Sequence, residues 1–170
     1  MPTALFHFPN PVNEVAARVV AGGVLGLSVL TIVLSTAIGH GWLWLTVPLA
    51  YGFVARVLAG PTLSPLGQLA TQVIAPRIGP AKLVAGPPKR FAQAMGATMS
   101  LAALVLHFGF GLDTAALVLL GLITVAATLE SVFAICVGCT VFASLMRLGL
   151  IPEATCAACA NITLREPRAA

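Results

Sequence analysis

The chain has 170 residues, the size of one domain. Hydrophobic residues make up 59% of it and charged residues 8%, against roughly 45–50% and roughly 25% in soluble domains; the mean hydropathy is +1.02. So few charges cannot cover a water-facing surface, which excludes a soluble monomer and a disordered chain. The net charge of +4 comes from nine basic residues set between apolar runs, which argues against the continuous basic face of a nucleic-acid-binding protein.

Four apolar runs are long enough to cross a membrane as helices, which takes about 20 residues each. In chain order they are residues 19–38, 42–58, 91–112 and 114–146. Asn10 and Pro11 predict a helix start just before the first run. The connectors after the first and third runs are short, so we expect an all-α integral membrane bundle of four transmembrane helices arranged as two hairpins.

The basic residues predict the orientation of this bundle. With four spans, all of them fall on the side of the N-terminus, the central loop and the C-terminus, and the two opposite connectors have none. The positive-inside rule then places both termini in the cytoplasm, with Trp42 and Trp44 at the outer interface. The nine are Arg18, Arg56, Arg77, Lys82, Lys89, Arg90, Arg147, Arg165 and Arg168.

The chain divides into a transmembrane bundle over residues 1–150 and a short cysteine-containing tail over residues 151–170. We expect the tail to lie in the cytoplasm. A Pro-rich cytoplasmic loop occupies about residues 59–90. Within it, residues 65–74 have the apolar pattern of a short helix lying in the membrane interface. An ordered Pro-rich connector fits the same residues.

The fourth run is too long for one span, because a helix over residues 114–146 would measure about 50 Å against a hydrocarbon core of about 30 Å. Three arrangements stay open: one projecting helix, a bend near Glu130 and Ser131, or a tight pair of short spans. The last would make five spans and put the tail outside. The charge rule favours four.

Small side chains repeat at helical spacing in two runs. Gly22 and Gly26 form one such ridge, and Ala92, Gly96 and Ser100 form another. Ridges of this kind allow close helix contact in lipid.

All four cysteines fall into two C-x-x-C pairs, Cys136 with Cys139 and Cys156 with Cys159. Two pairs at this spacing are typical of a four-thiolate site for Zn or Fe. They are equally typical of a dithiol relay, in which one pair passes electrons or sulfur to the other. Four spans place both pairs on the reducing cytosolic side, where a permanent disulfide is disfavoured. The plainer interpretation is that Cys136 and Cys139 are small packing residues.

Glu130 is the only acid inside a run, and a carboxylate within a membrane usually has a partner. Arg56 lies at a similar depth on the second run, so we expect an ion pair between Arg56 and Glu130, structural or in a proton relay. His107 lies near the outer end of the third run, too far in depth to join them, and is expected to be an interfacial histidine. His40 has no metal-ligand spacing to any neighbour.

These motifs together resemble a bacterial membrane family known only as domain of unknown function 4395, and the tail pair resembles one branch of it. The resemblance implies a helical bundle in the bacterial inner membrane. The family's association with sulfurtransferase and thioredoxin-type proteins implies a thiol or sulfur role. The matching residues are Arg56, residues 60–67 (GPTLSPLG), residues 88–93 (PKRFAQ), Glu130, residues 136–139 (CVGC) and residues 146–153 (MRLGLIPE).

The leading hypothesis is therefore thiol-redox or sulfur-relay work by the two cytosol-facing pairs with a soluble thioredoxin-like or sulfurtransferase partner. One alternative is a four-cysteine structural site for Zn or Fe on a membrane scaffold subunit. Another is a small permease for a sulfur oxyanion, acting as a homo-oligomer with Arg56 and Glu130 in its path. If the tail lies outside, the design resembles quinone-linked disulfide-forming membrane enzymes.

Overall fold

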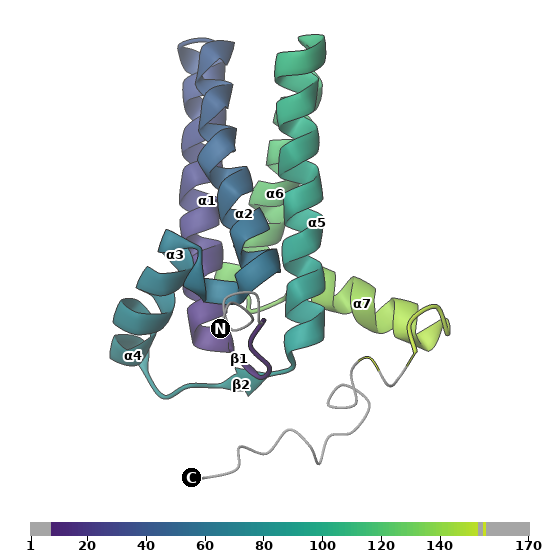
Figure 1. The fold of residues 1–170 in the computed structure, drawn as a ribbon. Coiled ribbons are helices and arrows are strands. Elements are labelled where there is room, and N and C mark those ends of the chain that lie inside the picture. The colour runs from purple at the N-terminus through teal and green to yellow at the C-terminus, as the bar shows by residue number, and fades with distance from the viewer. Residues whose placement is uncertain (1–7, 153–154, 156–170) are drawn as a thin grey trace, which may run out of the picture.

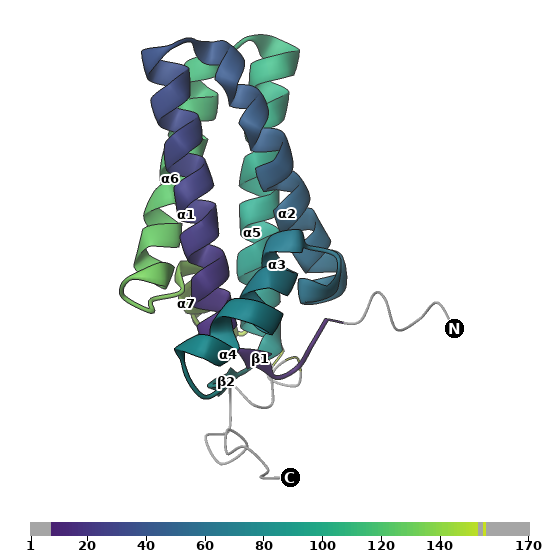
Figure 2. The same ribbon diagram turned by 90° about the vertical axis from the view of Figure 1, so that its left-hand side faces the viewer.

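A computed structural model describes residues 8–152 and Thr155 of the chain. In this part, four long helices lie side by side (Figures 1 and 2), and each is long and apolar enough to cross a membrane. The all-α membrane bundle is thus confirmed. The helices are α1 (Glu14–Ala37), α2 (Thr46–Ala59) with the 3-10 turn His40–Leu45 leading into it, α5 (Gly86–Leu104) extended by the π turn Val105–Gly109, and α6 (Asp113–Ser131).

The connectors from α1 to α2 and from α5 to α6 lie at the same end of the bundle (Figure 2). The most extensive packing joins α1 to α6 and α2 to α5. Two threonine hydroxyls donate hydrogen bonds within this packing: Thr31 to Leu27 O at 2.7 Å, and Thr124 on α6 to Ser28 Oγ on α1 at 3.0 Å. Because lipid offers no hydrogen-bond partner, such bonds are a favourable way to bury hydroxyls between helices.

Helix α1 begins at Glu14, and its N-cap is Asn13, whose side chain accepts from the N–H of Val15 at 3.0 Å. The start predicted at Asn10 was wrong by a few residues. Asn10 instead accepts from the N–H of Gly86 at 3.0 Å. This bond accompanies an antiparallel pairing of β1 (Val12–Asn13) with β2 (Leu83–Val84), which ties the start of α1 to the start of α5.

The Pro-rich loop contains the short helix predicted over residues 65–74, and this helix is longer than expected. It starts with α3 (Pro65–Gln68), continues through a π turn at Leu69–Ile74 and ends with α4 (Ala75–Ile78). Ser64 caps it by accepting from the N–H of Gly67 at 3.2 Å. This helix lies beside the lower half of the bundle, on the side away from α7 (Figure 1).

The helix of the long fourth run ends at Ser131. This agrees with the second of the three predicted arrangements, a bend near Glu130 and Ser131. Arg18 of α1 donates to the carbonyls of Ser131 at 3.0 Å and Val132 at 3.3 Å, a favourable place for a cation at a helix C-terminus. The chain then turns through Ala134, which has a left-handed φ of 58°.

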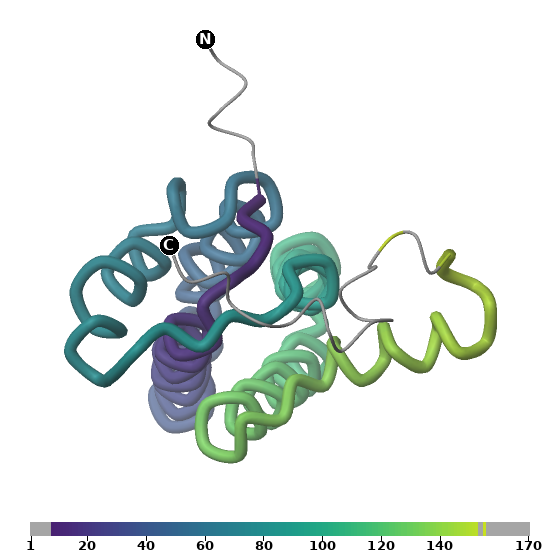
Figure 3. Tube along the Cα trace, turned by 90° about the horizontal axis from the view of Figure 1, so that it is seen from below, coloured from purple at the N-terminus to yellow at the C-terminus, as the bar shows by residue number. Residues whose placement is uncertain are grey.

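Helix α7 (Val137–Arg147) follows and runs sideways from the bundle (Figures 1 and 3). Its 11 residues are too few to cross a membrane, a span of about 20. The described residues therefore do not support the five-span alternative.

Candidate active site at the junction of α5, α6 and α7

Cys136 is the residue before α7, with φ −89° and ψ 104°, and its sulfur occupies the N-cap position that an oxygen of Ser, Asn or Asp usually takes. The backbone N–H of Cys139 donates to Cys136 Sγ at 3.4 Å. Both cysteines are half-buried free thiols. The C-x-x-C spacing thus brings two sulfurs together at the positive end of a helix, which favours a thiolate.

The two thiols differ in acidity because they share one hydrogen bond. The pKa of Cys136 is lowered, first by the hydrogen bond from the Cys139 thiol and further by the Lys89 cation, while burial and the Glu130 carboxylate oppose this change. The pKa of Cys139 is raised, first by the hydrogen bond that it makes with Cys136 and then by burial. Cys136 is therefore the thiol that ionises first.

The charges beside Cys136 come from Lys89 in the first turn of α5 and Glu130 in the last turn of α6. Lys89 Nζ lies 2.6 Å from Glu130 Oε1, and their side chains are only 10% and 15% exposed. The pair is therefore shielded from salt and water, which makes its field at Cys136 stronger than that of a surface pair.

The ion pair predicted between Arg56 and Glu130 is corrected by this geometry, because Lys89 is the residue that binds the carboxylate. Arg56 is buried at 5% exposure, and its Nε donates to Gln93 Oε1 at 2.7 Å while its Nη1 donates to Ser64 Oγ at 3.2 Å. Its Nη2 is buried without a partner among the described residues. Arg56 therefore joins α2 to α5 and to the Pro-rich loop rather than to α6.

Two cations and one carboxylate are thus buried at this end of the bundle, in Arg56, Lys89 and Glu130. Buried charge without compensation is costly. A thiolate on Cys136 would balance the three, so the charge distribution itself favours the ionised form of that thiol.

In the sequence, Lys89 counted only among the basic residues that predict the orientation, and its place in this site was missed. The available signal was its position: a lysine three residues after a helix start at Gly86, on the face that turns inward. Without knowing which face of α5 meets α6, the sequence could not distinguish Lys89 from the exposed Arg90.

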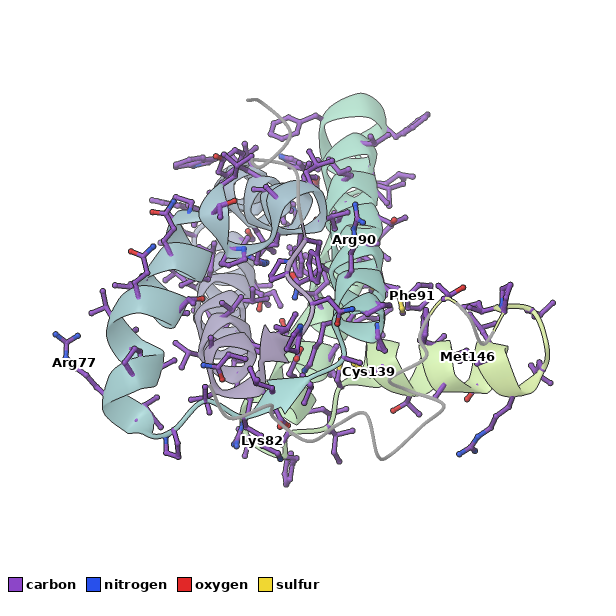
Figure 4. The ribbon with its side chains drawn as sticks, turned by 60° about the horizontal axis from the view of Figure 1, so that its bottom comes forward. Arg77, Lys82, Arg90, Phe91, Cys139 and Met146 are labelled. Carbon is purple, nitrogen blue, oxygen red and sulfur yellow. The ribbon has the colours of Figure 1, made fainter. Side chains whose placement is uncertain are left out.

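Gly138, between the two cysteines, brings α7 against α5. A Cβ on Gly138 would lie 2.5 Å from both Cα and Cβ of Ala92, closer than atoms pack. Figure 4 looks onto this end, with Cys139 at the start of α7 and Phe91 on α5 beside it. Only glycine allows this approach, which holds the cysteines over the Lys89–Glu130 pair.

A cavity of about 80 Å³ opens inside the bundle next to the site. Its walls are mostly apolar, with Phe53, Met99 and Ile123 among them, and its polar lining comes from Gln93, Glu130 and Cys136. This is room for a few water molecules. Cys136 therefore has a small internal space on its bundle side.

The opposite end of the bundle has a second polar cluster. Asp113 bridges two histidines: its Oδ1 lies 2.6 Å from His107 Nδ1 and its Oδ2 lies 3.0 Å from His40 Nδ1. His107 and His40 thus join the two connectors, a contact that spacing in the sequence did not reveal. Trp42 and Trp44 lie at this same end and are exposed.

Cys156 and Cys159 lie outside the described residues, so their distance from Cys136 and Cys139 is not defined. Among residues 8–152 and Thr155, no three His, Cys, Asp or Glu side chains are grouped as a metal site would require. The described half of the proposed four-sulfur site is the pair Cys136 and Cys139.

A family described as Domain of unknown function (DUF4395) matches residues 12–147. The matched segment covers the four long helices, the Pro-rich loop, the Lys89–Glu130 pair, Cys136, Cys139 and α7. No curated protein and no solved structure matches the chain.

The fold and the site therefore define the class first: a multi-pass helical membrane protein with a buried charge pair beside a C-x-x-C motif. The chain belongs to the DUF4395 family, as the sequence motifs indicated.

Proposed function

We propose that the protein performs thiol–disulfide exchange at the membrane surface with a soluble dithiol protein of the thioredoxin type. The single observation that supports this most is Cys136 at the N-terminus of α7, with its sulfur accepting from Cys139 and Lys89 close by. A structural packing pair has no need of a buried cation or of two thiols with opposite shifts in pKa.

In the exchange, the Cys136 thiolate attacks a sulfur of the partner's disulfide. A Cys136–partner disulfide forms, and the partner's other sulfur leaves as a thiolate. Cys139 then attacks Cys136 Sγ, its proton passing to the departed thiolate, and the partner is released as a dithiol. Two electrons have moved from the Cys136–Cys139 pair to the partner, and every step is reversible.

The proposed topology has both termini in the cytoplasm of a bacterium, with each consecutive helix pair crossing its inner membrane as a hairpin. The distribution of charge supports it. Every described Lys and Arg lies toward the α7 end of the bundle, and Figure 4 labels three of them there, Arg77, Lys82 and Arg90. The positive-inside rule makes that the cytoplasmic end.

Oxidised glutathione tests the proposal directly, since it is a small disulfide that any accessible thiolate attacks. In a Cys156→Ser/Cys159→Ser background, Cys139→Ser removes the resolving thiol, so one glutathione should accumulate on Cys136 at neutral pH. The matched Cys136→Ser variant leaves Cys139 without its hydrogen bond to the Cys136 thiol, but burial still raises the pKa of Cys139, so it should be modified much more slowly. Equal modification of both, or of neither, would overturn the assignment.

A second candidate, binding or passage of a sulfur oxyanion, is favoured by one observation. Arg56 has a buried Nη2 with no partner among the described residues, as an anion-binding guanidinium would. Thiosulfate uptake into proteoliposomes should then fall in Arg56→Gln and stay unchanged in Arg77→Gln, an arginine on α4. If thiosulfate uptake is the same in both variants as in the parent protein, this candidate is rejected.

A further inference from the structure

A groove of about 470 Å³ lies at the bundle end between the first turns of α5 and α7. We refer to it as the α5–α7 groove. Its volume is in the range of sites that hold a small ligand or a short peptide segment. Its lining includes Phe8, Val57, Arg90, Phe91, Phe142 and Thr155.

The first C-x-x-C motif lies one helical turn from a lining residue of this groove, and the second begins at the residue that follows Thr155 in the chain. Phe142 follows Cys139 by three residues on α7, so the two side chains lie one turn apart on neighbouring faces. Thr155 lines the groove and is bonded directly to Cys156, whose Cα lies about 3.8 Å from that of Thr155 in any trans peptide. The groove is thus lined by a residue one turn from Cys139 and by the residue that precedes Cys156.

We propose that the α5–α7 groove is the docking site for residues 156–159 of this chain, where Cys156 and Cys159 exchange a disulfide with Cys136 and Cys139. The inference rests on the proposed function and extends it, because it names the second dithiol in the exchange and where it binds.

The chemistry of the groove suits this segment. Phe91 and Phe142 form an aromatic wall, with ring centroids 5.7 Å apart. Arg90 is held by a hydrogen bond of 3.0 Å from its Nε to Val57 O. The sequence Cys-Ala-Ala-Cys is small and uncharged, so it fits an apolar wall, and a fixed guanidinium favours the thiolate that exchange requires.

The exchange starts from a Cys136–Cys139 disulfide, made by reaction with the soluble partner of the proposed function. The Cys156 thiolate attacks Cys139 Sγ, the Cys136–Cys139 bond breaks, and Cys136 leaves as the thiolate. Cys139 is the sulfur attacked because Cys136, with its lowered pKa, is the better leaving group.

Cys159 then attacks Cys156 Sγ and Cys139 leaves. A Cys156–Cys159 disulfide and a Cys136–Cys139 dithiol result. Two electrons pass from the second pair to the first, and the two protons lost by Cys156 and Cys159 are taken up by Cys136 and Cys139.

The test traps the intermediate in the full-length chain purified in detergent. The double variant Cys136→Ser/Cys159→Ser retains only Cys139 and Cys156, and a glutathione redox buffer should join them within one chain, as peptide mass spectrometry and a non-reducing gel would show.

Blocking the groove separates docking from mere proximity. Ala94→Trp, which fills the groove, and Phe142→Ala, which removes its wall, should each slow the Cys139–Cys156 bond at least tenfold. Ser144→Ala on the exposed face of α7 should not change it. The inference would be overturned if the Cys139–Cys156 disulfide formed only between chains, or if neither groove variant changed the rate at which it forms.

The glutathione experiment on Cys136 uses a background without Cys156 and Cys159. Its result is therefore independent of whether the tail docks in the groove. If Cys136 reacts but no Cys139–Cys156 bond forms, the proposed function stands and the docking site is wrong. If Cys136 does not react, the proposed function itself is rejected.

Discussion

The charge and hydrogen bonding around Cys136 come from three neighbours on three different elements. Cys139 on α7 supplies a thiol and a backbone N–H, Lys89 on α5 supplies a cation, and Glu130 on α6 orients that cation. At this scale the protein resembles other sites where a helix N-terminus and a nearby cation ionise a thiol. In the proposed exchange, the shared hydrogen bond distinguishes the attacking cysteine from the resolving one.

The hydrogen bond from Cys139 can be tested by removing its donor. Cys139→Ala should raise the pKa of Cys136 toward that of an ordinary thiol, so that less thiolate is present at neutral pH. Each unit of increase removes about nine-tenths of the thiolate. The pH dependence of Cys136 alkylation by iodoacetamide measures this, in the background without Cys156 and Cys159.

Cys139→Ser is the matched control, because a hydroxyl still donates to the sulfur. Its alkylation profile should stay closer to that of the parent chain. Identical profiles for the alanine and serine variants would show that the side chain of Cys139 does not set the reactivity of Cys136.

The Lys89–Glu130 pair should support both stability and reactivity. Lys89→Gln leaves a buried carboxylate without its cation, which costs about 3–5 kcal/mol, and it also removes the charge that favours the thiolate. Lys89→Gln/Glu130→Gln should regain most of the stability and part of the alkylation rate, because both charges have gone. Thermal unfolding in detergent and the alkylation rate give the two readouts.

Lys82→Gln is the control for this series. Lys82 pairs with Glu14 at 2.9 Å, but its side chain is 74% exposed, and exposed pairs contribute about 0–1 kcal/mol. If Lys89→Gln changes stability and alkylation no more than Lys82→Gln does, the buried pair has no part in the site.

Residue types indicated the chemistry of the site before the structure did, but not its contacts. The spacing of Cys136 and Cys139 predicted adjacent sulfurs, and the isolation of Glu130 predicted a buried partner. The choice of Arg56 as that partner failed because equal depth on two helices does not make them neighbours. Lys89 lies on α5, which packs against α6, whereas α2 packs mainly against α5.

Helix α7 is the element that builds the site, and two features set its position. The break after Ser131 sends the chain sideways, where Arg18 binds the carbonyls that end α6. Gly138 then lets α7 touch the backbone of α5 at Ala92. The length of the fourth apolar run showed that it was too long for one span. The position of the bend depends on contacts with Arg18 of α1, which lies more than a hundred residues earlier in the chain.

Gly138→Ala should push α7 away from α5. Overpacking of this kind costs about 1–3 kcal/mol, and the displaced Cys136 should lose the favourable field of Lys89. We therefore expect a lower unfolding temperature together with slower alkylation of Cys136. Both are measured on the same detergent-purified variant.

Gly121→Ala provides the comparison, since a Cβ on Gly121 of α6 meets nothing within 4 Å. In a helix interior that change should be neutral or stabilise by about 0.5–1 kcal/mol. A Gly138→Ala protein that behaves like Gly121→Ala would mean that the close approach of α7 to α5 is not needed.

The two small-residue ridges show how well a sequence pattern predicts the contacts between helices. The second ridge packs as predicted, since a Cβ on Gly96 would lie 2.3 Å from the Phe53 ring. The first does not, because Gly22 and Gly26 have nothing within 4 Å and it is the neighbouring Gly23 that lies under Leu66. Both ridges have the same spacing, and only the arrangement of helices decides which one is used.

The whole molecule has two chemically different ends. The C-x-x-C site and every described Lys and Arg lie toward the α7 end, while Trp42, Trp44 and the cluster of His40, Asp113 and His107 lie at the other. Composition and run lengths were enough to predict the four membrane helices, because hydropathy is a property of each segment alone. The packing order of the helices could not be predicted in this way, since it depends on how the shapes of four apolar helices fit together.

The proposed topology rests on this asymmetry and can be checked in intact cells. In chains with a single cysteine, residue 139 and an introduced Arg77→Cys should resist a membrane-impermeant maleimide until the membrane is broken. A cysteine introduced as Trp44→Cys, at the opposite end, should react at once. The reverse pattern would place the α7 end outside the cytoplasm and favour an oxidising, quinone-linked role for the pair.

The most direct test of the central claim, that Cys136 and Cys139 are a working redox pair, is metal content and free-thiol count on the same protein, purified in detergent without oxygen. Thiol exchange predicts no stoichiometric metal and cysteines that pass reversibly between dithiol and disulfide in a glutathione buffer. One Zn or Fe per chain, with thiols masked until the protein is denatured, would contradict the claim and identify a structural metal site instead.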